Sequence, residues 1–118
     1  IVMRVGLAGI DAPENSKIKG NPEQPYRQLA KEYLAELVLN KVVEIKGYGL
    51  DENSDVSAVL FLKGKNINIE MIRAGLGKLS GEELPQDLDL GPYRKAQNEA
   101  RKAERGIWSQ VNRLKFTY

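Results

Sequence analysis

Apolar residues recur along the chain at two spacings, and each spacing predicts its own kind of element. From Pro25 to Leu39 they return every three or four residues, which predicts a helix with one buried face. Pro22 and Pro25 suit the start of such a helix but not its interior, and Asn40 can adopt the left-handed conformation that ends it. We expect this helix to be core scaffold rather than a carrier of chemistry.

Three other segments are predicted to be strands, and one of them, Lys41 to Tyr48, alternates between apolar and polar positions. We expect strands from Ile1 to Ile10, from Lys41 to Tyr48 and from Val56 to Leu62. The segment from Gly49 to Asp55 is rich in Asp, Asn and Ser and is predicted to be an acidic turn. The tail over residues 110–118 also alternates, which is typical of a half-buried strand.

Two further helices are expected in the second half of the chain. Asn68 is the predicted N-cap of a short helix that ends at Gly75. Pro92 is predicted to open the last helix, and Gly106 to close it. The buried stripe of that last helix is predicted to comprise Tyr93, Ala96, Ala100 and Ala103. Ile107 and Trp108 are expected to dock onto the core behind it.

The first predicted strand runs into a stiffened loop that carries two carboxylates, Asp11 and Glu14. Gly9 breaks the strand, and Pro13 restricts both its own φ and the conformation of Ala12. Loops at strand ends are common places for cation and phosphate chemistry. Spacing alone leaves a plainer alternative open, in which Asp11 caps a turn and Glu14 is a solvated loop acid.

The amino-acid composition limits the kinds of functional site that the chain can form. The 118 residues are 42% hydrophobic and 29% charged, which suits one domain with a modest core and a formal net charge of +2. There is no cysteine and no histidine, so neither disulfides nor imidazole ligands are available. A metal site would have to use oxygen ligands, which suits Ca²⁺ or Mg²⁺. No apolar run is long enough to span a membrane, and no signal peptide is visible, which leaves the compartment open.

Four ordered stretches of the chain resemble the staphylococcal nuclease-like (thermonuclease) family. The stretches are Gly9–Glu14 (GIDAPE), Gln24–Tyr26 leading into Ala30–Leu34, Gly64–Asn68 followed by Arg73–Leu76, and Pro92–Tyr93 leading to Glu99–Ala103 and Arg105–Ser109. The resemblance implies an α+β fold, an OB-like five-stranded β-barrel with three α-helices. It covers the chain up to about Ser109 and implies one domain over residues 1–118, without the first two strands of the family barrel.

The chain departs from the pattern of the active family members. The resemblance assigns Glu14 to the activation of water and Asp11 to a metal, but the two arginines that hold the phosphate are matched by Gly6 and Asp55. Arg4 lies two residues from Gly6 on the same side of a strand, and we do not expect it to restore the geometry. Since no third carboxylate ligand is identifiable, we expect only weak Ca²⁺ binding and no certain cofactor.

The favoured interpretation is a catalytically degenerate module that binds nucleic acid or a protein partner. Arg4, Lys17 and Lys19 are the candidate nucleic-acid contacts. An active Ca²⁺-dependent endonuclease that hydrolyses DNA or RNA is the first alternative, and a purely structural scaffold is the second.

A sheet that lacks two barrel strands would expose the edge of its first strand, Ile1 to Leu7. A longer parent chain, the tail from Asn112 to Tyr118, or a second copy of the chain would each cover that edge. We expect the tail or a homodimer to do so.

Overall fold

The computed structural model describes residues 3–13, 24–81 and 84–109. Three helices are interspersed with six short strands in this part of the chain. Their order is β1 (Val5–Leu7), β2 (Ile10–Asp11), α1 (Gln24–Val38), β3 (Glu44–Leu50), β4 (Val56–Leu62), β5 (Lys65–Asn66), α2 (Ile67–Arg73), β6 (Lys78–Leu79) and α3 (Gly91–Lys102). The predicted α+β class and the three predicted helices are confirmed.

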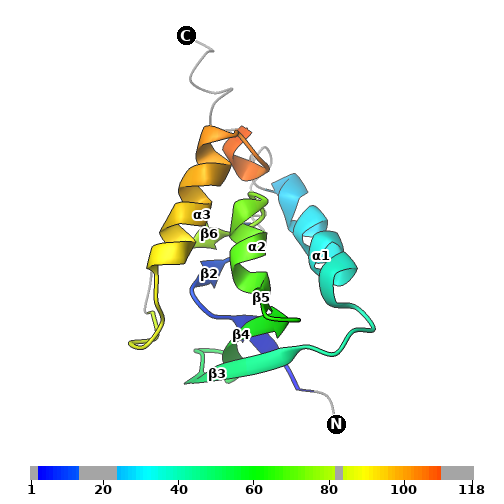
Figure 1. The fold of residues 1–118 in the computed structure, drawn as a ribbon, viewed down its shortest axis with the longest axis vertical. Coiled ribbons are helices and arrows are strands. Elements are labelled where there is room, and N and C mark those ends of the chain that lie inside the picture. The colour runs from blue at the N-terminus through cyan, green and yellow to red at the C-terminus, as the bar shows by residue number, and fades with distance from the viewer. Residues whose placement is uncertain (1–2, 14–23, 82–83, 110–118) are drawn as a thin grey trace.

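The strands form a mixed four-stranded sheet and a separate two-stranded ribbon. In the sheet, β4 is central: β1 pairs with it in parallel, and β3 and β5 pair with it antiparallel. The ribbon joins β2 and β6. In Figure 1 the sheet forms the base of the molecule, and the three helices stand side by side above it with α2 in the middle. The described strands do not close into a barrel.

The core lies where α2 meets α3. Ile72, Tyr93 and Ala96 form its buried centre, and partly buried apolar side chains pack around them. Ile107 is also buried, as predicted, and Trp108 is partly buried. No helix in the described part of the chain has the length and apolar character that crossing a membrane requires.

The predicted first strand is divided into two short strands that join different sheets. The break falls at Ala8 and Gly9, where Gly9 has a φ of +81°. A Cβ at Gly9 would lie 2.7 Å from a methyl carbon of Leu88 and 3.0 Å from the ring of Tyr93. Only glycine combines this left-handed backbone with such close packing. Residues 1 and 2 lie outside the described residues.

The short helix α2 begins with a different asparagine from the predicted one. Asn66 is the N-cap, and its Oδ1 accepts a hydrogen bond from the backbone N–H of Ile69 at 3.0 Å. Asn68 lies inside the helix and is completely buried. The prediction was wrong because both asparagines can cap a helix in isolation, and only the tertiary packing gives Asn68 three other partners.

Other boundaries moved by smaller amounts. The central strand β4 has the predicted bounds, and α1 is displaced by one residue toward the N-terminus. The second predicted strand begins later and runs on to Leu50. Asn40 has the left-handed φ, +61°, that was expected at the helix end. Ala103 is not part of the buried stripe of α3: it is the exposed C-cap of a helix that ends at Lys102.

Candidate functional site

The turn that precedes Asp11 is held by two buried side chains from different helices. The Nδ2 group of Asn68 donates to the carbonyl oxygens of Ala8 (3.1 Å) and Ala58 (3.0 Å), while its Oδ1 accepts from the Leu60 N–H (3.2 Å). The hydroxyl of Tyr93 also donates to the Ala8 carbonyl, at 3.1 Å. These bonds fix the end of β1 against β4, α2 and α3.

Asp11 itself lies at the end of β2 and is exposed, with Lys78 as its backbone partner in the ribbon. Burial raises the pKa of Tyr93, which bonds to Ala8 in the same turn, to about 12. The phenol therefore stays protonated and serves as a fixed donor, not as an acid or base near neutral pH.

The acidic turn after β3 is ordered by its first residue, Asp51. Its Oδ1 accepts from the backbone N–H groups of Asn53 (2.9 Å) and Asp55 (3.0 Å). Its Oδ2 lies 2.9 Å from the position that a Cβ would take at Gly6. A carboxylate of the turn therefore occupies the space in which a side chain at Gly6 would begin.

Two adjoining cavities open beside this turn. The larger, about 780 Å³, is lined by Asp11, Tyr48, Leu50, Asp51, Glu52, Ser57, Ser80, Leu84 and Pro85. Among these described lining residues three side chains are acidic and none is basic. The smaller cavity, about 460 Å³, lies between α1 and β1, and shares Asp51 and Glu52 with the larger one. An anion that enters the larger cavity would therefore meet carboxylates among the described lining residues.

The structure brings together only part of the predicted site. Asp11 lines the larger cavity and Gly6 the smaller one. Asp55 lines neither, since its backbone closes the turn on Asp51, and exposed Arg4 lines neither. Glu14, Lys17 and Lys19 lie outside the described residues, so the predictions for them stay untested.

The sequence analysis did not identify three of the side chains that lie at the cavities. Arg27 and Lys31 of α1 line the smaller cavity, and Asp51 orders the turn. The i, i+4 spacing of Arg27 and Lys31 places them on one side of a helix and was a usable signal. An Asp that begins a turn and is followed two residues later by Asn is also typical of an Asx turn. The contact of Asp51 with Gly6 had no sequence signal, because 45 positions of chain separate the two residues.

The described residues do not fit a calcium site. Within residues 3–13, 24–81 and 84–109, no group of three or more acidic side chains converges on a point that would hold a metal ion. Ca²⁺ takes about six to eight oxygen ligands, and Asp11 supplies at most two. The expectation of weak Ca²⁺ binding stays a prediction, and we route no chemical step through a metal.

Comparison with known proteins assigns the fold. Residues 4–110 match the family model described as staphylococcal nuclease homologue. The chain belongs to the staphylococcal nuclease family. Its α+β architecture is consistent with the OB-like fold that the resemblance implied.

Several relatives within the staphylococcal nuclease family carry the name "Probable endonuclease LCL3". The chain is 32% identical over 117 residues to the protein from Paracoccidioides lutzii, with 90% of this chain and 33% of that protein covered. It is 31% identical over 112 residues to that of Komagataella phaffii, covering 90% and 49%. It is 35% identical over 120 residues to that of Clavispora lusitaniae, covering 95% and 50%. The chain thus spans a third to a half of the length of these relatives.

Proposed function

We propose that this staphylococcal nuclease-like domain binds nucleic acid and hydrolyses phosphodiester bonds slowly or not at all. Membership of the family and the endonuclease names of the relatives support nucleic acid as the ligand class. The mildly basic net charge of +2 is compatible with it. A protein partner is the alternative ligand, and an inert scaffold is the third reading.

The contact between Asp51 and Gly6 carries the argument against catalysis. Cleavage of a phosphodiester needs positive groups on the charge that develops at the phosphoryl oxygens. Gly6 stands where the resemblance implies the first arginine, and the Asp51 carboxylate lies 2.9 Å from its Cβ position. A negative group therefore replaces a positive one beside the cleft. Loss of one preorganised stabiliser lowers the rate by roughly 10²–10³, and a repulsive charge adds to that loss.

The test is a cleavage assay combined with a binding assay on the same protein. Purified chain is incubated with labelled single-stranded DNA, duplex DNA and RNA, in Ca²⁺ or in chelator, alongside the variant Glu14→Gln. We expect no chelator-sensitive cleavage from either protein and salt-dependent binding from both.

Two results would contradict the proposal in different ways. Robust cleavage that needs Ca²⁺ and disappears in Glu14→Gln would establish an active endonuclease. Absence of binding to all three nucleic acids at low salt would leave the protein-partner and scaffold readings. A further variant, Gly6→Arg with Asp51→Ser, removes the carboxylate and supplies the arginine. Cleavage gained by that variant would attribute the inactivity to this contact.

A further inference from the structure

Helix α3 presents four basic side chains on one exposed side. They are Arg94, Lys95, Arg101 and Lys102, here called the α3 basic face. The opposite side of the helix is buried through Tyr93, Ala96 and Ala100. Arg94 and Arg101 are seven residues apart, as are Lys95 and Lys102, which is about two turns and about 10.5 Å along the helix. The four charges therefore form two parallel pairs along one face.

Little neutralises this face within the described part of the chain. The one acidic residue of α3, Glu99, accepts a hydrogen bond from Arg73 Nε at 3.2 Å, and no ion pair involves the four basic residues. The guanidinium of Arg101 stacks 5.3 Å from the centre of the Trp108 ring, which orients it and leaves it exposed. Glu104 lies beyond the end of the helix.

The helix dipole explains the positions of only two of the four basic residues. Arg101 and Lys102 lie in the last turn, where cations interact favourably with the negative end of the helix dipole. Arg94 and Lys95 lie near the opposite end, where cations gain nothing and acids are preferred. The first turn of α3 contains no acid. The helix dipole therefore does not account for the first pair.

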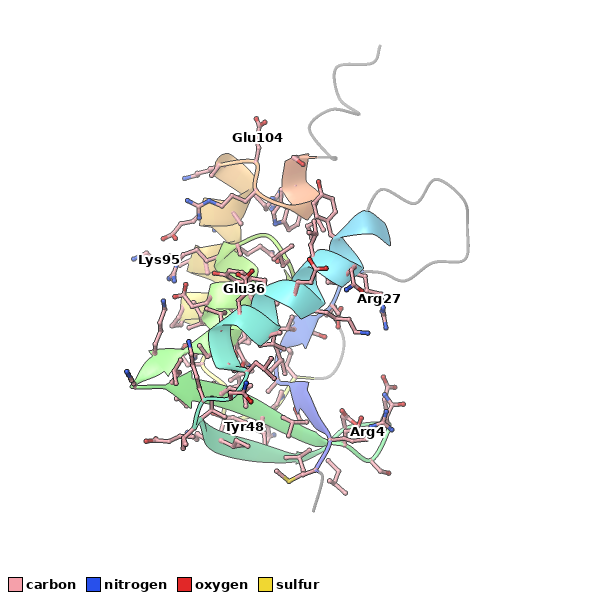
Figure 2. All side chains as sticks on the ribbon, turned by 90° about the vertical axis from the view of Figure 1, so that its right-hand side faces the viewer. Arg4, Arg27, Glu36, Tyr48, Lys95 and Glu104 are labelled. Atoms are coloured by element: carbon pink, nitrogen blue, oxygen red, sulfur yellow. The ribbon has the colours of Figure 1, made fainter. Side chains whose placement is uncertain are left out.

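We propose that the α3 basic face is a docking surface for the phosphate backbone of nucleic acid, separate from the acid-lined cleft. No residue of α3 lines either cavity. In Figure 2 Lys95 projects at one edge of the molecule, while Arg4 and Arg27 lie at the opposite edge. Along one strand of duplex DNA phosphates rise by about 3.4 Å, so the length of each basic pair spans about three phosphates.

Phosphate recognition fits this face better than insertion into a membrane surface. Interfacial helices combine basic residues with an apolar face that enters the lipid. The exposed large hydrophobic residues in the described part of the chain all lie outside α3. The only apolar stripe of α3 is already buried against α2. A charged, apolar-free face favours contact with phosphates in water.

The experiment compares two variants of equal net charge. The first carries Gln at Arg94, Lys95, Arg101 and Lys102. The matched control carries Gln at four other exposed basic positions that line neither cavity, Lys41, Lys46, Lys63 and Lys65. A third variant, Arg94→Lys with Arg101→Lys, keeps the charge. Affinity for short labelled DNA and RNA is measured as a function of salt on the full chain, with circular dichroism melts to verify folding.

We expect the α3 variant to bind roughly 10- to 100-fold more weakly at low salt than the control, with a salt slope smaller by about 3. The Lys variant should bind like the wild type. The proposal rests on nucleic-acid binding by the domain, and the two failures are distinguishable. If the wild-type protein binds no nucleic acid, the proposed function and the α3 docking surface are both overturned. If the α3 variant and the control lose affinity equally, or only the control loses affinity, the α3 docking surface alone is overturned. If binding to phosphatidylserine vesicles is also measured, vesicle binding weakened in the α3 variant alone, with DNA and RNA binding equal in both variants, would assign the face to a membrane and overturn the docking surface too.

Discussion

At the residue scale, the carbonyl oxygen of Ala8 is the point on which the loop before Asp11 depends. Asn68 and Tyr93 both donate to it, from helices that follow it in sequence by 60 and 85 positions. Asn68 also satisfies backbone groups of β4. A buried side-chain amide that meets three backbone partners is expensive to replace, because each orphaned group loses its hydrogen bond without regaining water.

Asn68→Ala should therefore lower the free energy of unfolding by about 3 kcal/mol. The control is Asn66→Ala, which removes only the N-cap bond and should cost about 1 kcal/mol. Urea unfolding of both variants measures the difference. Equal losses in the two variants would mean that Asn68 contributes no more than a cap.

The raised pKa of Tyr93 predicts that the free energy of unfolding depends on pH. Its pKa is raised by burial from 10.0 to about 12, so the folded state favours the neutral phenol. The stability that this provides is complete below pH 10 and is lost as pH rises through about 12. Compared with Tyr93→Phe, the wild type should lose about 1.4 kcal/mol for each pH unit across that interval.

Measurement of the two proteins side by side removes the contribution of lysines, which titrate in both. At neutral pH the Phe variant should be less stable by about 1 kcal/mol, since it lacks the bond to Ala8. Parallel stability curves above pH 10 would show that Tyr93 is not protonated preferentially in the folded state.

At the element scale, the end of α2 and the segment after α3 meet through two glycines. Gly75 and Gly106 both have positive φ, at +75° and +54°, and the N–H of Ile107 donates to the Gly75 carbonyl at 3.0 Å. A Cβ at Gly75 would lie 2.2 Å from the Arg105 carbonyl oxygen, and one at Gly106 would lie 2.1 Å from the Gly75 oxygen. Because the obstructing atoms belong to the backbone, they cannot move aside as a side chain would.

Gly75→Ala and Gly106→Ala should each lower the free energy of unfolding by about 3 kcal/mol or more, through strain and displaced backbone. Gly64→Ala is the matched control, because Gly64 has a similar φ of +79° and no atom within 4 Å of its Cβ position. It should cost only about 1 kcal/mol. Thermal melts that rank all three variants together would refute the role of the backbone contact.

At the scale of the whole molecule, opposite charges lie in different places, and one edge of the sheet is open among the described strands. Acidic side chains line the larger cavity, while basic side chains gather on α3. In the sheet, β1 pairs with β4 on one side only, and no described strand covers its other side. Arg4 and Ala8 bond to β4, so the alternate residues Val5 and Leu7 turn their backbone groups to the open edge.

This open edge predicts self-association by strand addition, the homodimer expected from the sequence. Sedimentation equilibrium over a wide range of protein concentration should show a reversible dimer. Val5→Pro removes an outward N–H without touching the ladder to β4 and should weaken the dimer. A monomer at every concentration would contradict this expectation. Deletion of residues 112–118, which lie outside the described residues, separately tests whether the tail covers the edge.

The sequence by itself was sufficient for the family, the fold class and the long periodic elements. The bounds of β4 and the extent of α1 follow from residues close together in the chain, since local spacing determines the type of element. That Gly6 and Asp55 stand in place of the family arginines was likewise predicted from single positions, and it stays a prediction.

Tertiary structure alone decided which of two asparagines caps α2, where the first strand breaks, and what faces Gly6. Asn68 does not cap the helix because its side chain bonds to the carbonyl oxygens of Ala8 and Ala58. The carboxylate of Asp51 lies beside Gly6, which belongs to a different strand. These outcomes depend on contacts between residues far apart in sequence, and no local pattern encodes the distance between such atoms. The four basic residues on α3 depend on both the sequence and the tertiary structure. The sequence determines their spacing, and burial of the opposite side of the helix determines that they face solvent.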